Sequence, residues 1–406
     1  MLRSISLFTL VALFLFFEMA LQVSPGIMTD DLMLSLNIDV FWLGIASGTY
    51  FITYTLMQIP AGLFYDRFSA RNVIMLPLLI CIIGGFLFGI AGNFYVAAAA
   101  RICMGFGSAF AYIGVLVVAS HVFDNKHFTL ISGITQLLAA LGAMCGALPL
   151  LPMIGYFGWR NTMLLISSSG IIVLLLMYLF LHLPKEHSIK KPVKSWVAFK
   201  SVAQKRQTWV VAVYVCLLWM PMSVVASLYG IPFIKQYFDM QFSSAVLIIT
   251  CMWIGIGFGS PIAGFIADKT QQLKSTLTYC AFIGVLAFGA IMFIPIKNAI
   301  TLACLFFIAG ASCAGQAISF SLVSRNNKTE HQGTAIGFNN MAIVISGFIF
   351  QPLVGYIIRL SQSQPINDNY LYDGGSYHTG MLIVFAGYII STLTSMFLIK
   401  NFKLKK

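Results

Sequence analysis

The chain has 406 residues, of which 59% are hydrophobic and only 9% charged, and its mean hydropathy is +0.90. A soluble globular protein carries about 25% charged residues, so this composition excludes a water-soluble domain and indicates an integral membrane protein with many spans. The formal net charge of +12 raises the question of nucleic acid, which the positions of the basic residues answer below.

The first predicted element is an apolar run from Ile5 to about Gly26 that contains a single ionisable residue, Glu18. The run is longer than the h-region of a signal peptide and no A-x-A cleavage site follows it, so we expect a retained first span. Moving a lone carboxylate from water into hydrocarbon is unfavourable by several kcal/mol. We therefore expect Glu18 to have a functional role inside the membrane.

Eleven more windows of roughly 20 mostly apolar residues follow along the chain, and together they predict twelve transmembrane helices. The predicted spans are 5–27, 40–63, 73–92, 95–119, 129–151, 161–182, 208–232, 243–266, 275–296, 299–323, 333–358 and 379–399. A basic polar stretch divides them, which predicts an N-terminal six-helix half over 1–182, a cytoplasmic linker over 183–207 and a C-terminal six-helix half over 208–406. The linker is expected to contain a short amphipathic helix on the inner leaflet or to be a solvated basic segment.

Lys and Arg residues are distributed unevenly between the loops, and this sets the expected orientation. If the N-terminus is cytoplasmic, 19 of the 24 Lys and Arg residues lie on the cytoplasmic side, 4 lie outside, and Arg101 lies within a span. Both termini are then cytoplasmic. The basic excess faces anionic lipid head groups, so the net charge predicts membrane lipids as partners and no nucleic acid.

Two segments of the chain repeat one another: “PAGLFYDRFSAR” (60–71) and “PIAGFIADKTQQLK” (261–274). Gly62 and Gly264 are 202 residues apart, and the first spans of the two halves begin 203 residues apart. A constant offset predicts two six-helix halves inserted in the same orientation.

Two six-helix sets, a basic central loop and the pattern G-x-x-x-D-R-x-x-x-R after the second span resemble the major facilitator superfamily of secondary transporters. “RICMGFGSA” in the fourth span and “GYFGWR” at the end of the fifth are similar to further motifs of that family. The resemblance covers the whole chain. It implies an all-α fold with two six-helix halves around a central cavity, and a monomer driven by a proton or sodium gradient without a cofactor. An enzyme is not expected, because no nucleophile–base set or metal-ligand set is apparent.

By resemblance, the loop motif and its copy form a conformational latch that breaks as the two halves rock. The residues assigned to this latch are Gly62, Asp66, Arg67, Arg71, Gly264, Asp268 and Lys269. Gly62 would let two helices approach closely. The Asp66 carboxylate would accept hydrogen bonds from a helix N-terminus or pair with a basic group of the other half. The alternative is that Asp66 and Arg67 are ordinary charges at a helix end.

Glu18 and Arg101 are the ionisable residues that lie well inside the predicted spans. At about 1.5 Å rise per residue, Glu18 lies about 20 Å and Arg101 about 21 Å from the cytoplasmic edge, so the two share a level. By resemblance, the first, fourth, seventh and tenth spans line the central cavity, which puts the two charges on facing cavity walls. Helical spacing and the same resemblance extend the candidate substrate or proton site to Gln22, Tyr54, Tyr112, Trp219, Ser223, Gln316 and Asn339. Tyr50 and Gln58 also lie in the second span.

Each of these candidates has a second interpretation. The polar stripe of the tenth span could hold helices together instead of binding a ligand. Arg101 could fix helix packing through backbone carbonyls, and Glu18 and Arg101 could satisfy each other. Because a buried ion pair is often no more stabilising than apolar packing, a functional role for the two charges is favoured.

The charge pair suits a small zwitterion, whose carboxylate would bind Arg101 and whose ammonium would bind Glu18. Glu18 could also carry a proton, which predicts a proton-coupled symporter. “FEMALQVSPGIM” and “QIPAGLFYDRFSARNVI” look like the phagosomal nutrient transporters of intracellular bacteria, which import amino acids or nucleosides. That resemblance implies uptake of an amino acid across a bacterial inner membrane. The alternatives are a nucleoside importer and an exporter of drugs or siderophores, although the antiporter pattern of span five appears only as Gly142, Gly146 and a displaced Pro149.

Overall fold

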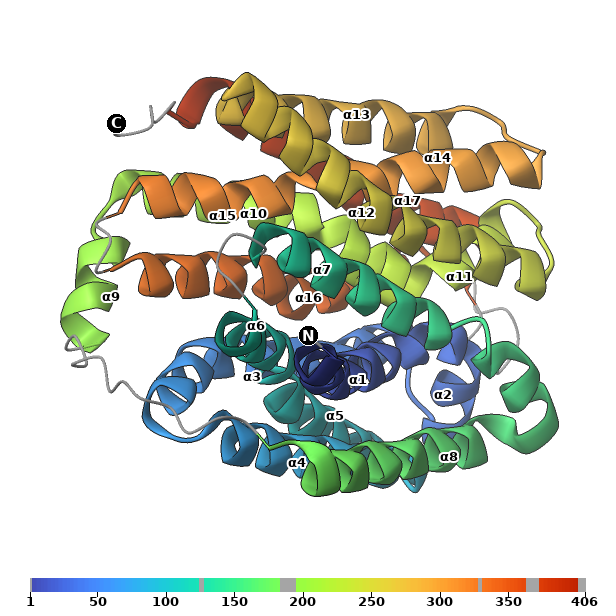
Figure 1. Ribbon diagram of the computed structural model, residues 1–406. Helices are drawn as coiled ribbons and strands as arrows, with labels where there is room; N and C mark the ends of the chain where they lie inside the picture. Colours follow the sequence, from blue (N-terminus) through green and yellow to red (C-terminus); the bar gives the residue numbers. More distant parts are fainter. Residues whose placement is uncertain (1, 124–127, 183–194, 328–330, 363–371, 401–406) are drawn as a thin grey trace. The chain divides into compact units, whose positions relative to one another are not determined.

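The computed structural model describes the chain except residues 1, 124–127, 183–194, 328–330, 363–371 and 401–406. Within the described residues, all regular elements are helices, and eleven stretches are long and apolar enough to cross a membrane. The remaining predicted span, 129–151, coincides with α7 (Phe128–Cys145). The chain therefore has the all-α, twelve-helix architecture that its hydropathy predicts (Figure 1).

The helices fall into two compact units, Met1–Lys190 and Lys191–Lys406. The first unit contains α1 (Leu2–Val23), η1 (Ser24–Ile27), α2 (Thr29–Leu36), α3 (Val40–Arg67), α4 (Ala70–Gly89), α5 (Phe94–Ser108), α6 (Ala111–Val122), α7 and α8 (Leu150–Phe180). The second unit contains α9 (Ser195–Ala203), α10 (Arg206–Met220), η3 (Pro221–Tyr229), α11 (Gly230–Tyr237), α12 (Phe242–Thr270), α13 (Leu273–Phe293), α14 (Ala299–Ser312), α15 (Gly315–Arg325), α16 (Gln332–Ser361), α17 (Gly374–Leu393) and η5 (Thr394–Leu398).

Interruptions at corresponding places recur between the units in two pairs of predicted spans. In the first unit, the 3₁₀ turn η1 follows α1 and contains Pro25, and a turn at Ala109–Phe110 separates α5 from α6. In the second unit, the π-helical segment η3 begins at Pro221, and a turn at Cys313–Ala314 separates α14 from α15. Proline lacks the N–H that continues an α-helix, which explains two of the four interruptions. These interruptions fall in the first, fourth, seventh and tenth spans.

Two helical segments lie outside the predicted spans. The short helix α2 has Asp30 and Asp31 in its first turn, where carboxylates favour a helix N-terminus. Its eight residues are too few for a spanning pattern, so the sequence analysis missed it. The helix α8 begins at Leu150 rather than near 161 and bends at Gly158, whose φ of 73° is accessible to glycine without strain. The predicted boundary between spans five and six is therefore wrong, because the residues from Leu150 to Gly158 form a short helical segment at the start of α8.

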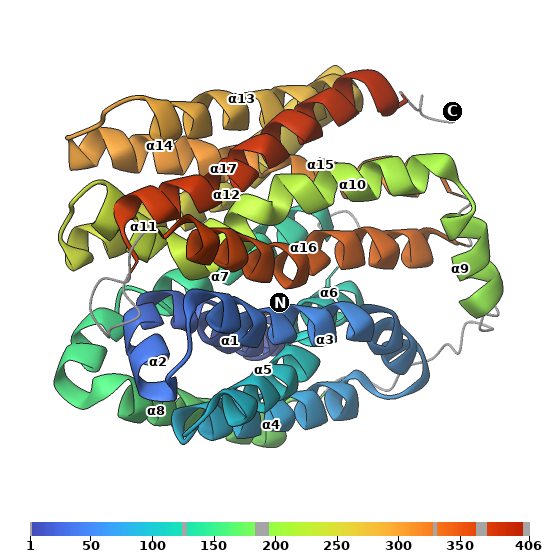
Figure 2. The same cartoon turned by 180° about the vertical axis from the view of Figure 1, so that it is seen from behind.

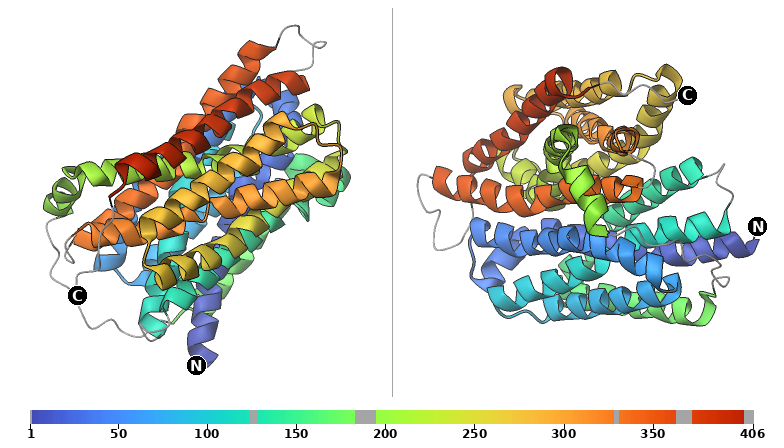
Figure 3. Two further views of the ribbon diagram at one scale, coloured as in Figure 1. Left: turned by 90° about the horizontal axis from the view of Figure 1, so that it is seen from above. Right: turned by 90° about the vertical axis from the view of Figure 1, so that its left-hand side faces the viewer.

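The same tight helix contact occurs in both units. A Cβ added to Gly105 of α5 would overlap the backbone of Tyr50 on α3, and one added to Gly310 of α14 would overlap the backbone of Met252 on α12. Tyr50 and Met252 are 202 residues apart, which is the offset of the sequence repeat. Glycine at these two positions lets neighbouring helix backbones approach closely. The two helix pairs, α3 with α5 and α12 with α14, are labelled in Figures 1 and 2. In Figure 3, α14 also lies beside α13.

The helical alternative for the linker is observed for its described part, α9. This helix crosses the ends of α10 and α16 in Figures 1 and 2. The ring of Phe199 lies 6.1 Å from that of Phe338 on α16, and Ser201 Oγ lies 2.9 Å from His331 Nδ1. These contacts attach α9 to the C-terminal unit, while its expected place on the inner leaflet stays a prediction.

Candidate functional site

Glu18 on α1 is completely buried, with an exposed fraction of 0%. The hydroxyl of Tyr50 on α3 donates a hydrogen bond to Glu18 Oε2 at 2.8 Å. The second carboxyl oxygen, Oε1, is buried and has no hydrogen-bond partner among the described residues. Half of this carboxyl is therefore held by the protein, and the other half is available to a proton or to a hydrogen-bond donor.

Tyr50 organises the groups around Glu18. Its hydroxyl has one proton, which goes to Glu18, and the 3.4 Å separation from Gln22 Oε1 marks a weaker contact. Tyr54 follows one turn later on α3, with its ring centre 6.0 Å from that of Tyr50. The sequence analysis places Tyr54 in the candidate site, whereas the direct contact with the carboxyl is made by Tyr50. Tyr112 on α6 is half-buried.

Arg101 on α5 is also buried, and its terminal nitrogens hold the backbone of α1. Nη1 donates to the carbonyl oxygen of Leu21 at 3.0 Å, and Nη2 donates to that of Gln22 at 3.3 Å. Pro25 has no N–H to offer the Leu21 carbonyl four residues before it, and the guanidinium and the Ser24 hydroxyl both donate to that oxygen instead. The interpretation in which Arg101 fixes helix packing through backbone carbonyls is therefore observed.

The two intramembrane charges do not meet directly. Within the described part of the chain, no ion pair joins Glu18 to Arg101, and the Tyr50 side chain lies between them. Its hydroxyl bonds Glu18, and its ring centre lies 4.5 Å from the guanidinium carbon of Arg101. The expectation that the two charges could satisfy each other is wrong, because each has another partner and the link between them passes through an aromatic ring.

Close helix packing fixes the position of these groups. Gly105, which comes one turn after Arg101, places α5 against the backbone of Tyr50. Gly142 of α7 and Gly146, which directly follows that helix, lie against the α1 backbone near Phe16 and Ala20, on either side of Glu18 in sequence. A side chain at any of these glycines would push α1 or α3 away. The glycines of the fourth and fifth spans thus have a local structural function.

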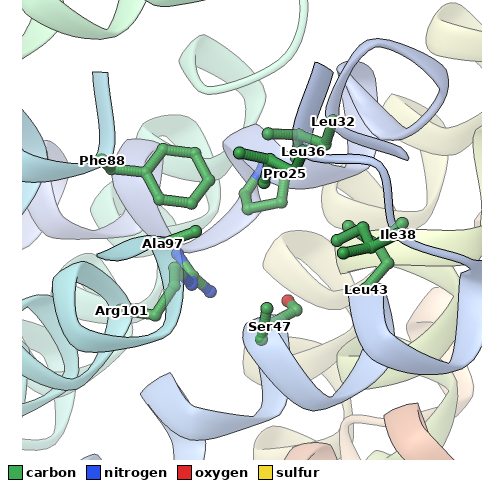
Figure 4. Close-up of a pocket in the computed structure, with 10 residues that line it drawn as sticks. Pro25, Leu32, Leu36, Ile38, Leu43, Ser47, Phe88, Ala97 and Arg101 are labelled. Carbon is green, nitrogen blue, oxygen red and sulfur yellow. The ribbon is translucent and has the colours of Figure 1, made fainter. Parts of the chain in front are cut away.

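A small pocket lies beside Arg101 in the N-terminal unit (Figure 4). Its walls come from η1, α2, α3, α4 and α5 and are apolar, with Ser47 and Arg101 as the two polar side chains. Figure 4 shows the Arg101 guanidinium at one side and Phe88 and Pro25 near it. The sequence analysis missed this pocket, because α2 is part of its wall and gives no spanning pattern.

In the C-terminal unit, Trp219 is half-buried and Ser223 is buried in a contact between η3 and α16. Ser223 Oγ lies 2.9 Å from Ser346 Oγ, and the side-chain amide of Gln351 donates to the Ser223 carbonyl oxygen at 2.7 Å. The hydroxyl of Tyr229 donates to the Gln351 carbonyl oxygen at 3.1 Å, so Gln351 is tied to both ends of the π-helical segment. Ser223 therefore holds helices together. A glutamine within the apolar eleventh span was the available signal for this contact.

Gln316 and Asn339 belong to one network between α15 and α16. Ser319 Oγ donates to the Gln316 carbonyl oxygen at 2.6 Å and accepts from Asn339 Nδ2 at 2.8 Å. Because the single Ser319 proton is used, Asn339 presents its amino group to Ser319 and its Oδ1 stays without a partner in the described residues. Gln316 Oε1 is likewise buried and unpaired. The polar stripe of the tenth span thus joins α15 to α16, as its second interpretation expected. Asn339 Oδ1 and Gln316 Oε1 are left as hydrogen-bond acceptors without a partner in the described residues.

The latch residues are only partly described. The side chains of Asp66, Arg67 and Asp268 lie outside the described residues, and the latch itself stays a prediction. Arg71 Nη2 donates to the Tyr178 carbonyl oxygen at 2.7 Å, which ties the start of α4 to the end of α8. The exposed Lys269 has its Nζ 5.9 Å from the ring centre of Phe265.

The two latch glycines are not seen in close contacts. A Cβ added to Gly62 or Gly264 would meet no described atom within 4 Å. The close helix approach expected at Gly62 is therefore not observed in the part of the chain that the structure describes.

Metal ligands are not gathered in the described residues, where no group of three or more His, Cys, Asp or Glu side chains is found. All eight cysteines are free. Cys81 Sγ lies 3.7 Å from Ser108 Oγ. The arrangement around Glu18 offers proton binding and hydrogen bonding.

Comparisons with known proteins agree on one fold. The model of the Major Facilitator Superfamily matches residues 7–351. A protein named “Probable sulfoacetate transporter SauU”, from Cupriavidus necator, is 20% identical over 365 residues, which cover 79% of this chain and 79% of that protein. A bacterial homolog of the human lysosomal transporter Spinster has a TM-score of 0.81 at 15% identity and covers 100% of this chain and 99% of its own. The nucleoside transporter NupG has a TM-score of 0.79 at 13% identity, with coverages of 97% and 100%.

At these identities the two solved structures show the fold alone. None of the three proteins confirms the finer resemblance to the phagosomal nutrient transporters, which stays a prediction.

Proposed function

Since the chain belongs to the Major Facilitator Superfamily, we propose that it is a proton-coupled importer of an amino acid that works by alternating access. The family and its transporter relatives indicate a multi-pass membrane transporter rather than an enzyme. The proposal adds the coupling ion, the substrate class and the direction of transport. It also places a monomer in a bacterial inner membrane with both termini in the cytoplasm.

The observation that carries the proposal is the half-satisfied carboxyl of Glu18. One oxygen is held by Tyr50 and the other has no partner, although the side chain is fully buried. A buried carboxylate without a cation is unfavourable, so the site favours an arriving proton or an ammonium group at Oε1. Tyr50 keeps the carboxyl in place in either case.

This geometry supports a simple coupling scheme. A proton taken up at Glu18 Oε1 would neutralise the carboxyl, and the loaded site would then be exposed to the other side of the membrane. Release of the proton to the cytoplasm would complete the cycle and drive accumulation of substrate. Arg101 acts as a positioning residue here, since its terminal nitrogens hold the α1 backbone next to the carboxyl.

The part of the zwitterion hypothesis that involves Arg101 receives less support. Nη1 of Arg101 donates to the Leu21 carbonyl and contacts Met104 Sδ, and Nη2 donates to the Gln22 carbonyl, so a bidentate contact with a substrate carboxylate would compete with these bonds. The ammonium part of the hypothesis, with Glu18 as the acceptor, agrees with the unpaired Oε1.

The experiment that tests the proposal is flux into proteoliposomes. Purified protein should accumulate a labelled amino acid when the lumen is alkaline, and a protonophore should abolish accumulation. Glu18→Gln should reduce gradient-driven accumulation to the level of empty liposomes, while exchange of labelled for unlabelled substrate continues. Glu18→Asp serves as the matched control that keeps a titratable group. Full accumulation by Glu18→Gln would contradict the proposed role.

Nucleoside import and export of drugs or siderophores are the alternatives within the same fold. Gly142 and Gly146 lie against the α1 backbone, so their presence in span five is explained without an antiporter function. The same liposomes separate these alternatives: uptake of labelled nucleosides would favour the first, and protection of cells against toxic compounds would favour the second.

A further inference from the structure

The interruption of the tenth span releases a backbone carbonyl from the helix. In a regular α-helix the Cys313 N–H would donate to the Ala309 carbonyl oxygen, four residues before it. Here it donates to the Gly310 carbonyl oxygen at 3.0 Å instead, as in a 3₁₀ turn. Ala309 is buried, with an exposed fraction of 0%. Because an unsatisfied carbonyl is unfavourable inside a membrane, this oxygen needs donors from elsewhere.

Tyr388 of α17 supplies one of these donors. Its hydroxyl donates to the Ala309 carbonyl oxygen at 2.9 Å, and the hydroxyl of Ser312 donates to the same oxygen at 2.6 Å. The Cys313 thiol adds a weak contact, with its Sγ 3.5 Å from that oxygen. The Tyr388 side chain is buried, and a Cβ added to Gly284 of α13 would overlap its ring. The phenol is therefore fixed between helices and directed at the interruption.

The first span has the same arrangement around the Leu21 carbonyl. Ser24, three residues later, donates to that oxygen at 3.0 Å, as Ser312 does to the corresponding oxygen of the tenth span. The second donor again comes from another helix, and in the first span it is Arg101. One local serine and one remote side chain thus replace the helix N–H at an interruption in each unit.

The residue four positions after each carbonyl distinguishes the two interruptions. In the first span it is Pro25, which has no N–H, so the helix ladder cannot close there. In the tenth span it is Cys313, whose N–H can return to the Ala309 oxygen when the 3₁₀ turn opens. The Ala309 oxygen is then satisfied in both forms, by two side-chain hydroxyls in the interrupted span and by Cys313 in a regular one. A 3₁₀ stretch inside a helix often marks a hinge, and two satisfied arrangements make it bistable.

We propose that Tyr388 is a positioning residue for transport, which holds the tenth span in its interrupted form by donating to the Ala309 carbonyl. The span changes to a regular helix during the transport cycle, and the Cys313 N–H then takes the place of the phenol. The inference rests on the alternating-access transport proposed above, and it does not depend on the substrate or the coupling ion.

The distance between two nitroxide labels in the purified full chain reports the shape of this span. The labels are introduced as unnatural amino acids at two exposed positions, Ile300 near the start of α14 and Ser321 in α15, so that the native cysteines stay in place. Pulsed electron paramagnetic resonance should show two distances, of which one matches the interrupted span. Tyr388→Phe should lower the ratio of the interrupted to the regular form about two- to tenfold, which corresponds to one neutral hydrogen bond.

Tyr65→Phe is the matched control, because it removes a phenol hydrogen bond at the interruption of the fourth span. Tyr65 donates to the Phe110 carbonyl oxygen at 2.8 Å, but that oxygen keeps the helix N–H of Gly114 at 2.9 Å. The ratio of the two forms of the tenth span should therefore stay unchanged in Tyr65→Phe. An unchanged ratio in folded Tyr388→Phe would overturn the proposal.

Cys313→Pro tests the same change from the opposite side. The φ of Cys313 is −67°, which is close to the value that proline requires, so the interrupted form accommodates the substitution. The variant lacks the N–H of the regular form, so it should show the interrupted distance alone. Its uptake of labelled amino acid into proteoliposomes should fall to the level of empty liposomes. Uptake by Cys313→Pro at the rate of the unmodified chain would overturn the proposal.

The label distances also separate this inference from the proposed function. If the unmodified chain takes up no amino acid but Tyr388→Phe still shifts the ratio of the two forms, the proposed substrate is wrong and the role of Tyr388 in shaping the span is supported.

Discussion

At the scale of single residues, Tyr50 connects groups that the sequence analysis treated as one pair. Glu18 and Arg101 stand out in the sequence because charges are rare within spans, and both are indeed buried. Which residue contacts them depends on the rotation of α3, and hydropathy does not determine that rotation. Tyr50 and Tyr54 lie one turn apart on that helix, so the sequence made both candidates and the structure selected Tyr50.

Tyr50→Phe should destabilise the N-terminal unit because it leaves both carboxyl oxygens of Glu18 without a donor. A hydrogen bond to a charged group contributes about 1.5–3 kcal/mol and one between neutral groups about 0.5–1.5 kcal/mol. Tyr65→Phe is the matched control, since Tyr65 donates to the neutral carbonyl of Phe110 at 2.8 Å. The melting temperature of the purified variants should therefore fall further for Tyr50→Phe. Equal decreases would argue that Glu18 is held as a neutral group.

At the scale of helices, the internal repeat includes packing as well as sequence. The contact of Gly105 with the Tyr50 backbone has its counterpart in the contact of Gly310 with the Met252 backbone. The sequence shows the repeat through the loop motif and the offset of the first spans, and the glycines of these spans resemble ordinary small residues of membrane helices. Their partners lie more than 50 residues away along the chain, so spacing within one helix does not reveal them.

Gly105→Ala and Gly310→Ala should each be destabilising, because a Cβ at either position would overlap backbone atoms of a neighbouring helix. Overpacking of this kind costs about 1–3 kcal/mol. Gly92→Ala provides the comparison, since a Cβ there meets no described atom within 4 Å. Thermal unfolding followed by tryptophan fluorescence should show a lower melting temperature for the first two variants only. A loss of stability in Gly92→Ala of similar size would indicate that the cause is backbone entropy rather than packing.

At the scale of the whole molecule, the two units share a framework but differ in polarity. The repeat counterparts of Glu18, Tyr50 and Arg101 are Met220, Met252 and Ala303. The corresponding positions of the C-terminal unit therefore lack the charges and the phenol, and its polar groups belong to serine and amide networks instead. A one-sided arrangement of charge agrees with the proposed role of Glu18 as the single intramembrane proton carrier.

Asp66→Asn should leave folding intact and slow transport, if the loop motif is a latch between conformations. Replacement of a carboxylate by an amide removes a charged hydrogen bond of about 1.5–3 kcal/mol, which corresponds to about tenfold or more in rate. Initial uptake rates at matched protein amounts check this expectation, and Asp268→Asn tests the repeat copy in parallel. Unchanged uptake by both variants would favour the alternative that these are ordinary helix-end charges.

The sequence by itself determined the membrane class, the twelve spans, the repeat and the two unusual charges, because each of these follows from local composition or a fixed spacing. Tertiary structure alone decided what the charges contact. Arg101 donates to the Leu21 carbonyl, which has no helix N–H partner because Pro25 lacks an N–H. Arg101 and Leu21 lie about 80 residues apart in the chain. The pocket at Ser47 likewise depends on α2, whose eight residues carry no spanning signal. Hydropathy reports how much of a helix is apolar, while the partners of its few polar atoms depend on how neighbouring helices rotate and pack.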